Sequence, residues 1–178
     1  VFEAGISQKD EMPALRDIIQ PTVGVLTNLG TAHQENFASL EEKCTEKLRL
    51  FHDTQAIVYP WDDEIVRSCV EKLDYKGQRI AWSTKDNAAR MFVKSVVKEN
   101  LSTTVNYVFD GVEGCYTLPF IDEASISNSI VCAAIALYLG LTTEQVATRI
   151  ANVEPVAMRL EVKQGQHGCT LVNDSYNS

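Results

Sequence analysis

A short apolar run, a glycine turn and a helical pattern follow one another between residues 23 and 51, and this order constrains the fold most. The run reads Val-Gly-Val-Leu at residues 23–26, which is typical of a buried strand in a parallel sheet. Gly30 supplies the backbone freedom of the turn. Apolar residues then recur every three or four positions, at Leu40, Cys44, Leu48 and Phe51. His33 therefore lies just beyond the carboxyl end of a strand, where open α/β sheets place their ligands.

The same alternation of strands and helices extends to both sides of this unit. We expect strands at residues 2–5, 22–28, 55–59 and 78–83, and helices at residues 13–19, 39–51 and 62–73. Ser39 and Glu42 have the spacing of a capping box at the start of one helix. A β-α-β-α-β order predicts a parallel sheet with right-handed crossovers.

The pattern changes in the second half of the chain. Three strands without intervening helices are expected at residues 89–99, 102–109 and 114–118, with turns at Asn100 and Asp110-Gly111. Helices at residues 121–139 (closed by Gly140) and from Thr142 or Thr143 to about residue 151 follow, and then strands at residues 160–163 and 170–173. The predicted fold class is α/β, a mostly parallel sheet flanked by helices with a small antiparallel insert at its edge.

Composition excludes some classes of function. The net charge of -8 argues against a general nucleic-acid binder, which is usually basic, but it does not exclude binding of a nucleotide. No apolar run approaches the roughly 18 residues of a membrane span. The five cysteines are scattered and form no CxxC pair, which is typical of reduced thiols, so we expect a cytoplasmic protein.

Both ends of the chain resemble cut points. The first residues look like the end of a strand, and the last residues stop just after another, so we expect a piece of a longer protein. No GxxxxGK[ST] phosphate loop occurs among the 178 residues. These residues alone therefore lack the usual cradle for a triphosphate.

Three residues in the first part of the chain are candidates for chemistry. Glu3, at an expected strand end, could hold Mg²⁺ through its carboxylate, or it could be a solvated loop acid. His33 occupies the analogous position one strand later, where it is either a ligand or an ordinary loop histidine. Lys47 lies in mid-helix between Glu46 and Arg49, where a solvated helix face is the simpler interpretation.

Three further candidates lie in the second half. Asn128 could point at a ligand or act as a local cap near the start of its helix. The donor fork of Arg159 suits phosphate oxygens, although a surface ion pair is the alternative. Asp174, at a strand end, could accept hydrogen bonds from a ribose diol or form an Asx-turn.

Two segments carry a resemblance to a known family. Residues 27–40 read Thr-Asn-Leu-Gly-Thr-Ala-His-Gln-Glu-Asn-Phe-Ala-Ser-Leu and resemble a signature of the Mur ligases, which build the peptide of bacterial cell-wall precursors. Residues 173–178 read Asn-Asp-Ser-Tyr-Asn-Ser and resemble the signature of the branch that adds D-alanyl-D-alanine. Glu3-Ala4-Gly5 with Glu11-Met12 also fits that branch, some of whose members are fused to an alanine racemase. The resemblance covers nearly the whole chain.

The resemblance implies a domain organisation and a reaction. Residues 1–172 would be an N-terminally truncated central ATP-binding domain with a P-loop NTPase-like fold, and residues 173–178 a hinge toward a missing C-terminal domain. The parent enzyme would use ATP and Mg²⁺ to join D-Ala-D-Ala to UDP-N-acetylmuramoyl-tripeptide through an acyl phosphate. The 178 residues alone are expected to be inactive.

The resemblance also assigns roles by position. Glu3 and His33 match metal-binding residues, and Lys47 matches a lysine that is carbamylated and helps to hold a second Mg²⁺. Asn128, Arg159 and Asp174 match residues that contact adenine, phosphates and ribose. His33 and Lys47 are thus the predicted catalytic residues.

Some positions depart from the family pattern. Ala124-Ser125 stand where His-Asn is usual, and Leu48-Arg49 follow Lys47 where Gly-Glu is common. These departures, with the missing phosphate loop, favour a rival hypothesis, a non-catalytic scaffold domain that kept the fold. A third possibility is a Mur-type amide ligase with a different acceptor.

Overall fold

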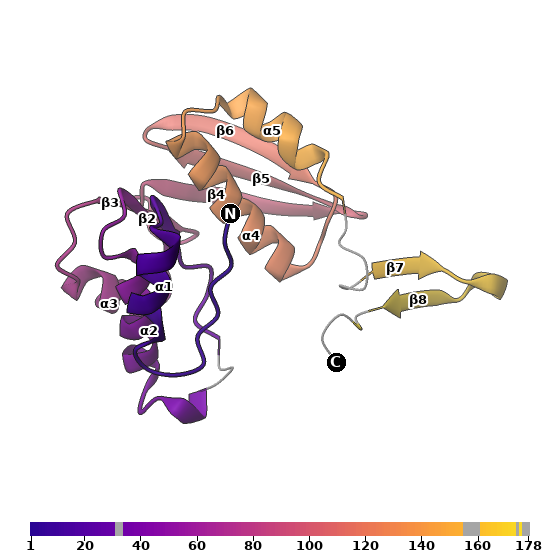
Figure 1. The fold of residues 1–178 in the computed structure, drawn as a ribbon. Coiled ribbons are helices and arrows are strands. Elements are labelled where there is room, and N and C mark those ends of the chain that lie inside the picture. The colour runs from indigo at the N-terminus through magenta and orange to yellow at the C-terminus, as the bar shows by residue number, and fades with distance from the viewer. Residues whose placement is uncertain (31–33, 155–160, 174, 176–178) are drawn as a thin grey trace.

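A six-stranded sheet forms the centre of the molecule in this computed structural model, which describes residues 1–30, 34–154, 161–173 and 175 (Figure 1). The strands lie in chain order and comprise β1 (Val23–Val25), β2 (Ala56–Pro60), β3 (Gln78–Ser83), β4 (Met91–Glu99), β5 (Ser102–Phe109) and β6 (Val112–Leu118). The pairs from β1 to β4 are parallel, and β4, β5 and β6 are antiparallel. The expected α/β architecture is therefore confirmed.

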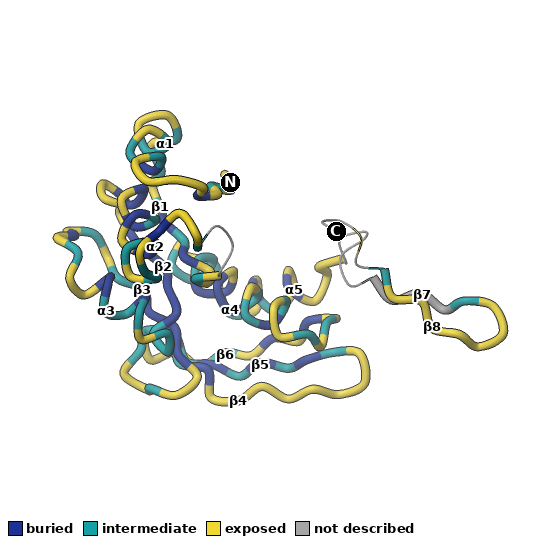
Figure 2. Tube along the Cα trace, turned by 90° about the horizontal axis from the view of Figure 1, so that it is seen from below, coloured by how far each residue is buried: buried dark blue, intermediate teal, exposed yellow. Residues whose placement is uncertain are grey.

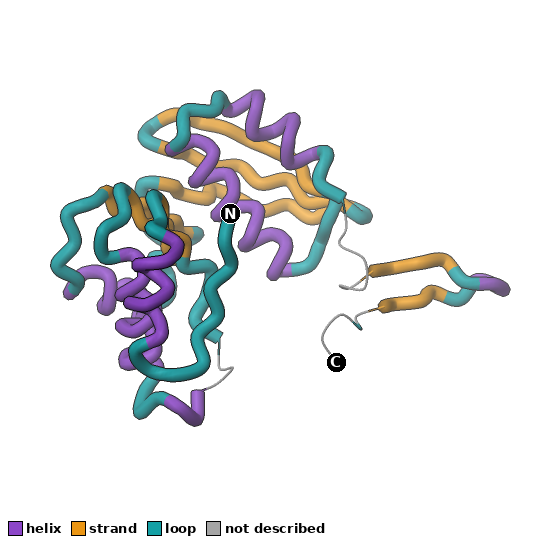
Figure 3. Tube along the Cα trace, viewed as in Figure 1, coloured by secondary structure: helices purple, strands orange, loops and turns teal. Residues whose placement is uncertain are grey.

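Helices cover both faces of the sheet (Figure 3). They are α1 (Glu11–Ile19), α2 (Leu40–Leu48), α3 (Glu64–Lys72), α4 (Glu123–Tyr138) and α5 (Thr143–Ala151), with 3-10 turns η1 (Gln34–Asn36), η2 (Arg49–Phe51) and η3 (Gln166–Gly168). Strand β2 shows the layering because its side chains alternate. Ala56 and Val58 join the core beneath α4 and α5, whereas Ile57 and Tyr59 join the core beneath α1, α2 and α3. Every β2 residue is consequently buried.

The start of α2 forms half of the expected capping box. The hydroxyl of Ser39 accepts a hydrogen bond from the N–H of Glu42 at 3.1 Å. The Glu42 carboxylate, however, accepts from the N–H of Ala38 at 2.6 Å and not from that of Ser39. The helix start is thus tied to the residue before the cap.

The later helix ends follow their sequence signals. Asp122 caps α4 by accepting from the N–H of Ser125 at 2.8 Å. Gly140, at φ +90°, ends that helix as predicted. Thr142 is the cap of α5, and with Gln145 it forms a complete capping box.

The antiparallel strands extend the main sheet at its edge, where the sequence predicted them. Strand β4 pairs with β3 through two positions, Trp82↔Met91 and Ser83↔Phe92, before it turns into the β4–β5–β6 meander. In β5 buried and partly buried residues alternate, because α4 and α5 cover only one face (Figure 2). The remaining described strands, β7 (Glu161–Gln164) and β8 (Thr170–Asn173), pair as the expected hairpin.

The prediction of a strand at residues 2–5 is wrong. Residues 1–7 form no strand, because no strand among the described residues pairs with them. An apolar anchor and a hydrogen bond hold this segment instead. Ile6 is only 6% exposed and packs into the core beneath α1, α2 and α3. The side-chain amide of Asn36 donates to the carbonyl of Ser7 at 2.8 Å.

Candidate functional site

A buried lysine joins the turn after β1 to helix α2. Lys43 is 2% exposed, and its ammonium donates a hydrogen bond of 2.6 Å to the carbonyl oxygen of Gly30. Sequence reasoning assigned Lys43 no role. The available signal was its spacing of four residues from Lys47, which places both amines on one side of the helix.

Lys47 lies one turn after Lys43 and is half-buried. Burial lowers the pKa of its ammonium, and the neighbouring charge of Lys43 lowers that pKa further. No hydrogen bond joins the Lys47 ammonium to the described part of the chain. A lysine in this setting has a larger neutral fraction than a solvated one, and neutral amines are the reactive form. The solvated helix face that was the simpler interpretation is therefore wrong for this helix.

Of the two charges that flank Lys47, Glu46 is buried and Arg49 is exposed. Glu46 is 6% exposed, and its Oε2 accepts from Nη1 of Arg49 at 2.7 Å. The same Arg49 atom lies 2.6 Å from Oδ1 of Asp10, in the residue before α1. These contacts attach the segment that follows Glu3 to the helix that carries Lys47.

Glu3 is exposed, and its carboxylate makes no hydrogen bond or ion pair with the described residues. The chain that follows it is fixed at three points. Ile6 is buried in the core, the carbonyl of Ser7 is held by Asn36, and the N–H of Ser7 donates to the carboxylate of Glu11 at 2.7 Å. The Glu3 carboxylate is thus open to a cation, on a segment attached to the loop after β1.

Asn128 lies exposed on α4, and it is not the cap of that helix. Its neighbour Ser129 instead contacts the sheet, with its hydroxyl 2.9 Å from that of Tyr116. The amide of Asn128 has no hydrogen bond to the residues that the structure describes. It is therefore accessible to a ligand, and the adenine contact that the resemblance implies stays a prediction.

Three predicted site residues, His33, Arg159 and Asp174, lie outside the described residues. Their roles stay predictions. Within the described ranges, no group of three or more histidine, cysteine, aspartate or glutamate side chains could hold a metal ion. Glu3 and Lys47 nevertheless have chemistry that suits Mg²⁺, because Glu3 offers an open carboxylate to one ion and a carbamylated Lys47 would offer an oxygen ligand to a second. Across the same ranges, no helix is long and apolar enough to cross a membrane.

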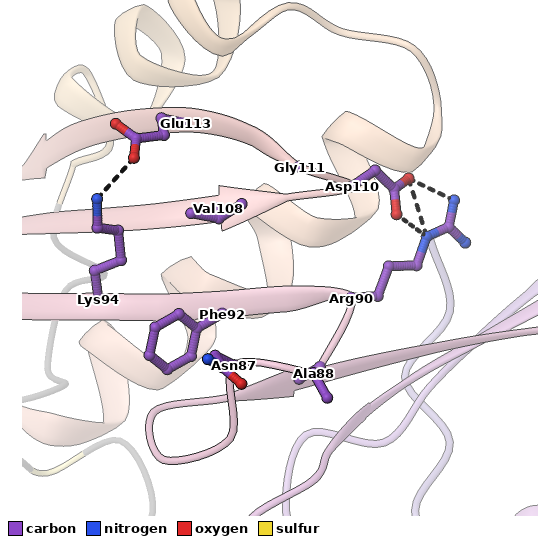
Figure 4. A pocket seen from close by; sticks show the side chains of 10 residues that line it. Asn87, Ala88, Arg90, Phe92, Lys94, Val108, Asp110, Gly111 and Glu113 are labelled. Carbon is purple, nitrogen blue, oxygen red and sulfur yellow. Dashed lines mark hydrogen bonds and ion pairs between the residues drawn. The ribbon is translucent and has the colours of Figure 1, made fainter.

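A surface groove of about 490 Å³ lies on the uncovered face of β4 and β5 (Figure 4). Its charged walls are already paired. Arg90 contacts Asp110 at 2.8 Å, and Lys94 contacts Glu113 at 2.8 Å. No predicted site residue lines this groove. The candidate site therefore lies at the turn after β1 and α2, and not in this hollow.

Comparison with known protein families decides the classification. The model of the Mur ligase middle domain matches residues 1–136. The chain belongs to the Mur ligase family. This family match includes the turn at Gly30 and helix α2, which carry the described part of the candidate site.

Relatives of known name match the whole chain at modest identity. A UDP-N-acetylmuramoyl-tripeptide–D-alanyl-D-alanine ligase of Bacillus subtilis is 24% identical over 100% of the chain and 38% of its own length. The ligase of the same name from Mycobacterium bovis is 27% identical over 100% of the chain and 35% of its own length. The chain thus spans little more than a third of the relatives that it matches.

Solved structures share the fold. MurF from Acinetobacter baumannii matches 100% of this chain and 39% of its own chain, with a TM-score of 0.81 and 22% identity. MurF from Thermotoga maritima in complex with ADP matches 97% of this chain and 39% of its own, with a TM-score of 0.78 and 21% identity. These likenesses confirm the Mur ligase central-domain fold predicted from the sequence.

Proposed function

We propose that this chain is the central domain of an ATP-dependent ligase that joins D-Ala-D-Ala to UDP-N-acetylmuramoyl-tripeptide in peptidoglycan precursor synthesis. Mur ligase family members are ATP-dependent ligases that form amide bonds. The relatives from Bacillus subtilis and Mycobacterium bovis, whose names specify this acceptor, align with the full chain. The signature-like residues 173–178 support the same acceptor. We expect such an enzyme in the cytoplasm.

The observation that carries the proposal is the setting of Lys47. Its amine is half-buried, has a lowered pKa, and lacks a hydrogen bond to the described residues. A solvated surface lysine needs none of these properties. A lysine that must react as a neutral amine with CO₂, and then present carboxylate-like oxygens, needs a less solvated position of this kind.

In this proposal the candidate residues bind different parts of the reactants. Mg²⁺, when bound, would neutralise charge on the transferred phosphoryl group and on the acyl phosphate. Glu3 and His33 would hold one Mg²⁺, carbamylated Lys47 would help to hold a second, and the buried Lys43 would stabilise the Gly30 turn. Asn128 would orient adenine, while Arg159 and Asp174 would hold phosphate and ribose. Binding and orientation of the reactants are thus the main contributions of this domain.

A ligase assay on the enzyme that contains this chain tests the proposal. Phosphate release should require ATP, the tripeptide substrate and D-Ala-D-Ala together. Lys47→Ala should remove nearly all activity, and acetate or formate should restore part of it, because a small carboxylate can occupy the place of the carbamate. Lys72→Ala, on the exposed side of α3, is the matched control and should retain activity without added carboxylate.

Each other outcome selects a different function. Turnover of UDP-N-acetylmuramate with L-alanine, and none of the tripeptide substrate with D-Ala-D-Ala, would identify a Mur-type ligase with other substrates, such as the UDP-N-acetylmuramate–L-alanine ligase of Prochlorococcus marinus, which is 23% identical over 95% of the chain. No turnover with any acceptor would reject the ligase and favour the scaffold. Full activity of Lys47→Ala would remove the proposed role of that residue.

A further inference from the structure

The Gly30 turn has little packing to hold it in place. Gly30 is exposed, and among the described residues a Cβ added to it would meet only the Asn28 side chain, at 3.9 Å. On the strand side, Leu26 is the last buried residue, at 3% exposure, and Leu29 is only partly buried. Packing against the described residues therefore restrains the Gly30 turn little, and a directed interaction is needed to fix its carbonyl.

The ammonium of Lys43 provides that interaction. It reaches the carbonyl oxygen of Gly30 at 2.6 Å, from a side chain that is 2% exposed. Charge-assisted hydrogen bonds of this length are stronger than neutral ones. Burying an ammonium is also costly, so a lysine here contributes less to stability than an apolar residue of similar shape could. A role in placing the turn accounts for a charge at this position.

The contact between Lys43 and Gly30 links the turn after β1 to α2, the helix that carries Lys47. Lys47 follows Lys43 by one turn of α2, and an α-helix holds that spacing rigidly. His33 is three residues beyond Gly30 in the sequence, so the position of Gly30 limits where His33 can lie. We propose that Lys43 is a positioning residue, which holds the Gly30 turn against the helix that carries Lys47. This inference rests on the proposed function only where metal binding is concerned.

The test compares Lys43→Met with Lys43→Arg and with a matched control, Lys94→Met, in the enzyme that contains this chain. Lys94 is exposed on β4 and bonded to Glu113. Lys43→Met keeps the length of the side chain but removes the donor and the buried charge. Its Tm should be unchanged or higher, since the exposed carbonyl of Gly30 can bond to water instead.

Two measurements follow the turn and the site separately. The backbone NMR order parameters of residues 28–30 should fall in Lys43→Met, and the Mg²⁺ concentration for half-maximal phosphate release should rise by about tenfold or more, as for other partners that orient metal ligands. The turnover number at saturating Mg²⁺ should fall less than the Mg²⁺ dependence shifts. Lys43→Arg should restore most of both properties, and Lys94→Met should leave both unchanged.

Several outcomes would overturn the inference. These are unchanged order parameters at residues 28–30 in Lys43→Met, a Mg²⁺ dependence equal to that of Lys94→Met, or an activity loss that only parallels a loss of Tm. A wild-type enzyme without ATP-dependent ligation would reject the proposed function instead. In that case the order parameters of residues 28–30 still decide whether Lys43 holds the turn.

Discussion

Arg49 Nη1 lies 2.7 Å from Oε2 of Glu46, and this pair places a carboxylate inside the layer of helices beneath the sheet. The Glu46 side chain is only 7% exposed. Its other oxygen, Oε1, is buried and has no hydrogen-bond partner. Arg49 also reaches Asp10 at 2.6 Å, so one guanidinium connects α2 to the residue before α1.

Removing Arg49 should destabilise the fold because it leaves a buried carboxylate without its cation. Arg49→Met is expected to lower the free energy of unfolding by about 2–3 kcal/mol, measured by urea denaturation. Adding Glu46→Gln should recover part of the loss, since an amide is less costly to bury than a carboxylate. Arg16→Met, which breaks pairs with the exposed carboxylates of Asp17 and Asp53, is the control, and an equal loss of unfolding free energy there would contradict the prediction.

Gly24 is required by the close approach of an aromatic ring. A Cβ at this position would lie 2.4 Å from Cγ of Phe51 and 2.9 Å from its Cβ. Gly24→Ala should therefore cost about 1–3 kcal/mol of unfolding free energy. Phe51→Leu should cost less in the Gly24→Ala background than alone, a coupling that a double-mutant cycle measures. Gly5→Ala, where no described atom lies within 4 Å, is the control and should leave the free energy of unfolding unchanged. Additive effects of Gly24→Ala and Phe51→Leu would contradict the predicted contact.

Lys47 should reduce stability at neutral pH. Its pKa in the folded state lies below the ordinary 10.5 because of burial and the charge of Lys43. As the pH falls through 10.5, Lys47 binds its proton in the unfolded chain before it does so in the folded chain. The free energy of unfolding is therefore lowered at pH 7, and this destabilisation disappears above pH 10.5. Lys47→Met should raise stability by about 0.5–1 kcal/mol at pH 7, in thermal unfolding. Lys72→Met should have no such effect, and a destabilised Lys47→Met would contradict the argument.

Asp62 should support the fold only above acidic pH. Burial alone would raise its pKa, but hydrogen bonds from the Ser83 hydroxyl and from the N–H and hydroxyl of Thr84 outweigh burial and hold the pKa below the ordinary 3.8. A depressed pKa contributes stability above the unfolded value, and this is lost as pH falls through the folded value. The Tm of Asp62→Asn should lie below that of the wild type at pH 6, and the gap should narrow toward pH 3. A difference in Tm between Asp62→Asn and the wild type that does not change with pH would contradict this prediction.

Much of the fold follows from local patterns. The alternation of apolar runs and helical periodicity predicted the parallel strands, and β3 has the predicted bounds, residues 78–83. Turns at Asn100 and Asp110-Gly111 also lie where polar residues and glycine indicated, all at positive φ. Such features depend on the backbone preferences of single residues and on the spacing of apolar residues, and both can be read directly from the sequence.

Other features depend on contacts between distant segments. The strand expected at residues 2–5 lacks a partner among the described strands, and pairing is a property of two segments. Charge alone suggested a solvated face at Glu46, but its burial depends on the packing of α2 beneath the sheet. The capping box at Ser39 is half formed because Glu42 bonds to Ala38 instead.

The sequence by itself determined the α/β class, the order of the elements and the family signature around Gly30, because these are written in residue type and spacing. Only the tertiary structure decided that Lys43 is buried against the Gly30 carbonyl and that Arg49 joins Glu46 to Asp10. The physical reason is that desolvation and hydrogen bonding of a charged side chain depend on which distant atoms surround it. No local pattern of residues records those neighbours.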